Sequence, residues 1–260
     1  MSLYARDNGT LSAAITVASG SNLTFAVWIK TDPQFRQAVG HVDLITQVGA
    51  TNGFAIFRLP FVDGTGQSPR LQYAMANSAG AVSTKQTPSL PLLGDGQWHH
   101  VAVTDANSGL LFYVDGIRVA AANTFRSVGY TGAVTTTIAG NGSGTYGIYK
   151  HDAQLFARVL TPGEIKALAD GVSVAGVKGR YCLGSALSGF DHSGTGNHLT
   201  TVSAESGQFT GAEDPPWFRV GQTKSRYGRR HLRGFVAAAG GAPAIIAAYY
   251  HLRRRLESAA

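Results

Sequence analysis

The sequence of 260 residues contains a single cysteine, Cys182. One cysteine excludes an internal disulfide and a zinc site built from several cysteines. The chain must therefore hold its fold by burying apolar side chains, which a chain of this length can do. The first residues lack a basic segment followed by an apolar run, so we expect no signal peptide.

Carboxylates are also scarce, since only 14% of the residues are charged. The glutamates are four in number: Glu164, Glu205, Glu213 and Glu257. Glycoside hydrolysis needs two carboxylates that flank the scissile bond, and none of the glutamates falls on a predicted central strand. The Gly-x-Ser-x-Gly motif of serine hydrolases is absent. We therefore predict no catalytic residues and a protein that is not an enzyme.

The excess positive charge is confined to one end of the chain. Residues 218–260 carry a formal charge of +8, whereas residues 1–217 carry −1. This division predicts a neutral body and a basic arm that contacts an acidic partner. We expect a protein partner rather than nucleic acid.

The body shows alternating apolar residues separated by turn residues, without long helical patterns. In the segment 23–30, Leu23, Phe25, Val27 and Ile29 fall on one face. Further strands are predicted at 42–48, 53–59, 70–76, 98–104, 110–114, 117–121, 135–139, 148–159 and 199–202. The segment 105–109 predicts a hairpin, and Asp115-Gly116 predicts a tight turn. Strands at this spacing predict an all-β fold of two antiparallel sheets.

One short helix interrupts the strands at 161–171. Thr161 is placed as the N-cap, Pro162 lies in the first turn, and Glu164 completes a capping box. Gly171 supplies the stop signal.

The basic arm, residues 218–260, contains an uncharged stretch of 18 residues at 235–252. That length allows a short membrane span, but Gly240, Gly241 and Pro243 lie in its middle. A helix that begins at Pro243 and docks on a partner is our preferred interpretation. The residues assigned to docking are Arg226, Arg229, Arg230, Arg233, Ile245, Tyr249, Leu252, Arg253, Arg254 and Arg255.

Three segments resemble a known family. They are Asp95-Gly96-Gln97-Trp98-His99-His100-Val101-Ala102-Val103 with Leu111-Phe112-Tyr113-Val114-Asp115-Gly116, then residues 152–165, and Phe25-Ala26-Val27-Trp28-Ile29-Lys30. They resemble the laminin-G-like and pentraxin-like domains of the concanavalin A type. The resemblance implies a jelly-roll sandwich with one short helix over residues 1–217, followed by the arm as a separate unit.

The resemblance bears on several candidate sites. It implies that His99 and His100 are structural and point to opposite faces of their strand. The glucanases of this fold class present Glu-x-Asp-x-x-Glu along one strand, a pattern that this chain lacks. Many members bind calcium, but the family's ligands cannot be mapped onto the candidates Asp43, Asp63, Asp95 and Asp152, so we assign no cofactor and leave calcium open. Asp191, His192 and His198, with Cys182 nearby, fit no standard zinc spacing and predict a hydrogen-bonded turn.

Members of the family bind sugars, proteins or lipids, or act as structural modules, so the fold alone does not choose a function. Our preferred hypothesis is a structural or decoration protein of a larger assembly, a phage virion, that is made in the host cytoplasm, forms homo-oligomers and contacts other virion proteins through the arm. The alternatives are a carbohydrate-binding adhesion module and a membrane-anchored protein of the cell surface. Tyr130, Tyr146 and Tyr149 are the candidates for stacking on surface glycans, and we predict that they lie on loops.

Overall fold

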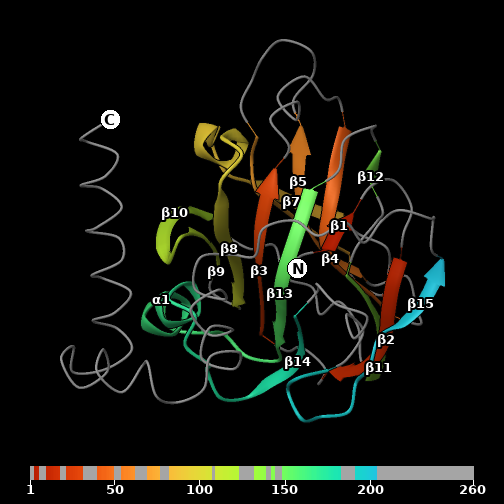
Figure 1. Cartoon of the computed structure of the whole chain (residues 1–260). Coiled ribbons are helices and arrows are strands. Elements are labelled where there is room, and N and C mark those ends of the chain that lie inside the picture. The colour runs from red at the N-terminus through yellow and green to blue at the C-terminus, as the bar shows by residue number, and fades with distance from the viewer. Residues whose placement is uncertain are drawn as a thin grey trace, which may run out of the picture.

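The computed structural model describes residues 3–5, 10–17, 22–31, 40–49, 54–61, 69–76, 82–106, 109–122, 132–138, 142–143, 148–182 and 191–203. These residues form two antiparallel sheets and one α-helix, as predicted (Figure 1). The basic arm, including every residue assigned to docking, lies outside the described residues. The proposed division of the chain at residue 217 therefore stays a prediction.

The first sheet has seven strands in the order β1-β13-β3-β8-β9-β10, with β14 paired to β13. Its strands are β1 (Leu3–Ala5), β3 (Leu23–Thr31), β8 (Trp98–Ala106), β9 (Gly109–Val114), β10 (Ile117–Ala122), β13 (Ile148–Phe156) and β14 (Val177–Tyr181). The predicted hairpin is confirmed, because Ala106 pairs with Gly109 where β8 passes into β9.

The second sheet has eight strands in the order β15-β2-β11-β4-β5-β6-β7, with β12 paired to β4. Its strands are β2 (Thr10–Val17), β4 (Gly40–Gly49), β5 (Phe54–Phe61), β6 (Gln72–Ala76), β7 (Val82–Gln86), β11 (Gly132–Thr137), β12 (Gly142–Ser143) and β15 (Thr200–Ser203). Three of these strands, β2, β7 and the two-residue β12, are not among the predicted ones. In β7 the alternation of side chains is nearly all polar, so hydrophobic periodicity gives little signal there.

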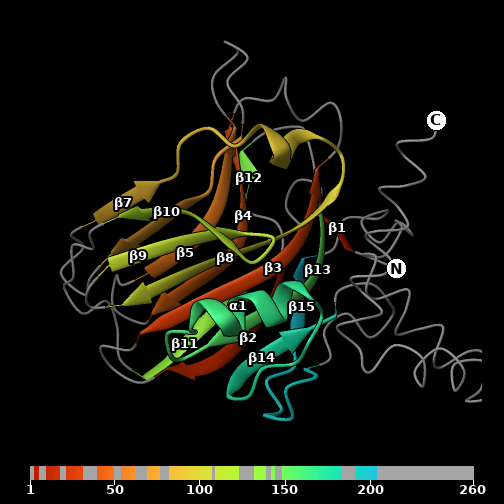
Figure 2. The same ribbon diagram turned by 90° about the vertical axis from the view of Figure 1, so that its left-hand side faces the viewer.

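The main core lies between the two sheets. Leu23, Phe25, Val27 and Ile29 of β3 all face it, which confirms the predicted alternation. The opposite face of β3 is buried as well, because a second apolar cluster forms on the outer side of the same sheet. That cluster joins Ala26, Ala102, Tyr113 and Phe156 to Leu160 and to Ile165 and Leu168 of α1 (Pro162–Ala169). The helix thus covers the outer face of the seven-stranded sheet (Figure 2).

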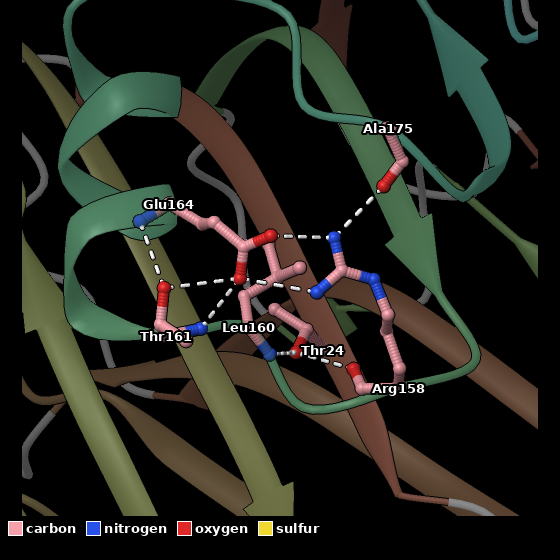
Figure 3. Close-up of polar contacts among 6 residues, drawn as sticks. All are labelled: Thr24, Arg158, Leu160, Thr161, Glu164 and Ala175. Carbon is pink, nitrogen blue, oxygen red and sulfur yellow. Dashed lines mark hydrogen bonds and ion pairs between the residues drawn. The ribbon is translucent and has the colours of Figure 1, made fainter.

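The start of α1 is fixed by the predicted capping box. The Thr161 hydroxyl accepts a hydrogen bond from the Glu164 amide, and the Glu164 carboxylate accepts one from the Thr161 amide at 2.8 Å (Figure 3). Arg158 binds both oxygens of that carboxylate, at 2.7 and 3.0 Å. The Arg158 hydrogen bonds, together with those from Thr161, lower the pKa of Glu164 to about 2. Glu164 is therefore a capping residue rather than a catalytic acid.

Two hydrogen bonds connect the two sheets across the core. Lys150 of β13 is fully buried, and its ammonium donates to the main-chain carbonyl of Asp43 in β4. Burial lowers the pKa of Lys150 to about 7. The Tyr73 hydroxyl of β6 bonds the Asp105 carboxylate of β8 at 3.1 Å. These contacts fix how one sheet is placed over the other.

The turn between β9 and β10 holds α1 in place. Asp115 and Gly116 have φ values of 51° and 80°, as the predicted Asp-Gly turn requires. A Cβ added at Gly116 would lie 2.6 Å from Lys166 Cδ and 3.0 Å from Lys166 Cα. The helix therefore packs directly on a turn at which no side chain fits.

We predict that Gly116→Ala destabilises the protein more than Gly194→Ala does. Both glycines have φ near 80°, but a Cβ at Gly194 meets nothing within 4 Å. The shared strain of a positive φ costs about 1 kcal/mol, and overpacking against the helix adds about 1–3 kcal/mol at Gly116. Denaturant unfolding of the two variants measures the difference in the free energy of unfolding. Equal values would show that α1 does not rest on this turn.

Candidate binding face

The outer face of the eight-stranded sheet carries a polar ladder across four neighbouring strands. Asp43, Arg58, Gln72 and Gln86 lie directly opposite one another on β4, β5, β6 and β7. The Arg58 Nε donates to Gln72 Oε1, and Gln72 Nε2 donates to Gln86 Oε1 at 3.2 Å. At a strand spacing of about 4.8 Å this row is about 14 Å long.

Two further rows lie beside the ladder on the same face. One row is Thr46, Ile56, Ala74 and Thr84, and the next is Val48, Phe54, Ala76 and Val82. Val48 is 48% exposed and Val82 is 60% exposed, while Phe54 and Ile56 are half-buried. We call these three rows together the ladder face. It combines hydrogen-bonding groups with an apolar strip, the composition of a ligand-binding surface.

The ladder face ends in an acidic residue that burial makes harder to ionise. Asp43 is 8% exposed, and loss of hydration raises the pKa of its carboxyl. His41 lies 3.8 Å from that carboxylate, and burial lowers the pKa of His41. Asp43 and Arg58 therefore lie side by side at one end of the ladder, a carboxyl group beside a guanidinium.

The outer face of the other sheet offers a different surface. The helix α1 covers Ala26 and Ala102 there, and Trp28 and His100 are buried with their rings 5.6 Å apart. The ladder face lies on the sheet that α1 does not cover. Its residues Gln86, Val48 and Val82 are exposed, whereas Asp43, Thr46, Ala74 and Ala76 are buried.

Comparison with known proteins assigns the chain to a family. A family model for laminin-G-type domains, described as the concanavalin A-like lectin/glucanases superfamily, matches residues 5–166. The chain belongs to this superfamily. A search of curated protein sequences gave no match.

Solved structures resemble this member of the superfamily only distantly. They include the receptor-binding domain of botulinum neurotoxin C/D mosaic serotype (13% identity, TM-score 0.46, 58% of this chain and 36% of that chain). The binding domain of Paraclostridial Mosquitocidal Protein 1 gives 16% identity, a TM-score of 0.44, and 59% and 38% coverage. A heptameric SAP-like pentraxin from Limulus polyphemus gives 16% identity, a TM-score of 0.44, and 65% and 81% coverage. The chain thus spans little more than a third of the two clostridial structures.

The structure places the predicted sugar-stacking residues less favourably than their sequence suggests. Tyr149 lies within β13, paired with Tyr4 and Lys30, and is half-buried, so the prediction that it stands on a loop is wrong. It lies there because the strand begins at Ile148, whose side chain enters the core. Tyr130 and Tyr146 lie outside the described residues.

The two adjacent histidines differ as their positions on a strand require. His99 lies between two carboxylates, with Nδ1 2.8 Å from Asp115 and Nε2 3.2 Å from Asp95, and these contacts outweigh burial and raise its pKa. His100 is 1% exposed on the opposite face, and burial lowers its pKa to about 4. The prediction that they act separately as structural residues agrees with this geometry.

The candidate metal ligands are separated in space or bound to protein groups. Asp152 binds the Arg180 guanidinium at 2.7 Å, and Asp95 binds His99. Asp191 accepts hydrogen bonds from Ser193, Thr195, Asn197 and the Arg180 amide, which confirms the predicted turn. Within the described ranges no group of three or more such residues is placed to hold a metal ion. Asp63 is outside them.

The predicted arm and membrane alternatives fall on residues that are not described. Within the described ranges, no helix has the length and apolar character needed to cross a bilayer. The segment 235–252 and the arm's arginines lie outside the described residues.

We predict that His100 makes the fold sensitive to acid. Because its folded pKa of about 4 lies below the usual histidine value of 6.5, the unfolded chain takes up the proton first as the pH falls. Its contribution is fully present above pH 6.5 and is lost towards pH 4, a decrease of about 3 kcal/mol in the free energy of unfolding. His100→Asn should remove this part of the slope, as measured by denaturant unfolding at pH 7, 5.5 and 4.

The matched control is His192→Asn, because His192 is exposed in the Asp191 turn. That variant should retain the slope of the unchanged protein. An unaltered slope in His100→Asn would contradict the burial of a neutral imidazole.

Proposed function

We propose that the chain is a non-catalytic binding protein within a larger assembly, and that the ladder face holds its ligand. The ladder is the observation that carries this proposal. Three side chains on three strands are joined by hydrogen bonds, and an apolar strip whose end residues Val48 and Val82 are exposed runs beside them. Such a surface orients polar groups with defined geometry and removes apolar area from water when a ligand binds.

The positions and contacts of the described carboxylates favour binding over hydrolysis. A glycosidase needs an acid and a second carboxylate on either side of one bond. On the ladder face the described carboxylate is Asp43, which stands alone at the end of the row. Glu164 serves the helix cap, and Asp152 serves Arg180 on the other sheet.

A glycan is the ligand class that fits the face best. Sugar hydroxyls pair with the amides of Gln72 and Gln86, and the C–H face of a sugar ring packs on Phe54 and Val82. This proposal replaces the tyrosine-based site, since Tyr149 lies on the other sheet.

The larger assembly is the second part of the proposal. The arm carries +8 beside a body of −1, which favours docking of the arm on an acidic protein surface. A virion remains the assembly that we propose, with a role as capsid or tail decoration. A cell-surface adhesin with the same ladder face is the alternative.

We predict that Val82→Asp abolishes glycan binding on an array probed with the full chain. A charge at this exposed position removes the apolar contact and must be desolvated when a sugar ring approaches. Ile117→Asp is the control, because Ile117 is 67% exposed on an edge strand of the other sheet. Binding that survives Val82→Asp but not Ile117→Asp would place the site elsewhere. Silence of the unchanged chain across the array would contradict glycan binding itself.

We also predict that the arm governs self-association. The full chain should give the mass of a defined oligomer by light scattering. A full-length variant with Arg229, Arg230 and Arg233 replaced by glutamine should give the mass of a monomer, because it loses three of the arm's positive charges. As a control, Arg118→Gln tests whether any arginine change has this effect, because Arg118 is exposed on β10. Equal masses for the chain and the arm variant would contradict an assembly role for these residues.

A further inference from the structure

The strand β7 ends the eight-stranded sheet, and half of its backbone groups point away from that sheet (Figure 2). The Thr87 amide donates to the Leu71 carbonyl at 2.9 Å, one step beyond the paired residues of β6 and β7. Hydrogen-bonded pairs alternate along an antiparallel ladder, so the odd-numbered residues of β7 turn their N–H and C=O groups towards β6. The even-numbered residues Val82, Thr84 and Gln86 turn theirs outward. Among the described strands, none pairs with this outer edge.

The other described strands at the rims of the sheets are short or bulged. β1 and β12 have three and two residues, and β10, β14 and β15 pair with their neighbours through register shifts. Short strands and bulges are devices by which natural sheets prevent pairing at their edges. β7 has five residues without a proline, pairs with β6 without a shift, and carries one charged residue, Lys85. Of the described edges, β7 is therefore the one suited to accept another strand.

A second copy of β7 fits this edge in one register. Antiparallel pairing about a twofold axis at Thr84 places Val82 opposite Gln86 of the second copy, so all the outward backbone groups find partners. Lys85 then lies opposite Ser83 of the second copy. A shift of two residues in one direction places the two copies of Lys85 opposite each other, and like charges in that position are destabilising. The opposite shift leaves the backbone groups of Gln86 outside the paired strands.

We infer that two copies of the chain pair through β7, in the antiparallel direction and centred on Thr84. The pair joins two eight-stranded sheets into one continuous sheet and places two ladder faces on the same surface. This inference rests on the self-association that we propose for the arm, because a strand pair of this length is marginal on its own. A ligand with repeated units then meets two binding faces at once, which raises its affinity without any new contact.

Thr84→Pro tests the pairing in the full chain. Proline removes the outward N–H of Thr84 but no hydrogen bond within the sheet, and edge strands tolerate proline at such positions. We expect the concentration at which the oligomer dissociates, measured by light scattering over a dilution series, to rise at least about tenfold. The matched control is Thr84→Ala, which keeps the N–H and should shift this concentration much less. Circular dichroism checks that both variants are folded.

Cysteine cross-linking tests the register without proline. Residues opposite each other in a hydrogen-bonded pair have Cα atoms about 5.5 Å apart, a distance that a disulfide spans. Thr84→Cys should therefore form a covalent dimer after mild oxidation with oxidised glutathione. Val82→Cys is the control, because four residues separate it from its own copy in this register, a distance of about 14 Å. Cys182 is present in both variants, so any disulfide through it contributes to both.

The outcomes separate this inference from the proposed role of the arm. An oligomer that the arm variant loses but Thr84→Pro retains would overturn the β7 contact and leave the arm's role intact. Equal shifts in Thr84→Pro and Thr84→Ala would overturn pairing through the backbone. A cross-link in Val82→Cys but not in Thr84→Cys would overturn the register. A monomeric unchanged chain that gives no cross-link in either cysteine variant would contradict both the strand pairing and the role of the arm.

Discussion

The hydrogen bond from Lys150 to the carbonyl of Asp43 connects the core to the surface that we propose as the binding face. Lys150 reaches across the sandwich from β13, and its acceptor lies where β4 shifts register between Asp43 and Ile45. A bulge of this kind changes which side chains face outward. With Asp43 aligned to Arg58, the polar side chains of four strands fall in one row. Burying a cation costs free energy because the charge loses its hydration, and this cost lowers the pKa of Lys150.

The consequence is a sandwich with two unlike outer surfaces. On the seven-stranded sheet, α1 and its capping network with Arg158 cover an apolar cluster, so that side is closed by the protein itself. On the eight-stranded sheet, the ladder face exposes Gln86, Val48 and Val82, while Arg58 and Gln72 are half-buried. The difference between the covered side and the proposed binding side follows from which sheet the helix packs on.

Much of this fold is visible in the sequence because its signals are local. The alternation at Leu23–Ile29, the Asp115-Gly116 turn and the Thr161–Glu164 capping box each depend on residues close together in the chain, and each is confirmed. Membership of the superfamily follows from the same motifs. The strand predicted at 148–159 already contains Tyr149, and β13 confirms it over Ile148–Phe156, so the placement of Tyr149 on a loop goes against a local pattern.

The ladder face is hidden in the sequence for the opposite reason. Gln72 lies fourteen residues after Arg58, and Gln86 lies fourteen residues after Gln72. None of the three belongs to a sequence motif. Their alignment depends on the pairing register of β5, β6 and β7, and β7 itself has too little apolar periodicity to be predicted. A shift of one residue in any pair would turn one member to the other face.

The most direct test of the account is to observe the ladder side chains while ligand is added. In the full chain, the side-chain N–H resonances of Arg58, Gln72 and Gln86 can be followed by nuclear magnetic resonance during titration with a glycan that the array identifies. The account predicts that these three signals shift together and saturate at one ligand concentration, while the Arg118 signal on the other sheet stays in place. Saturable binding that leaves the three ladder signals unmoved would contradict it.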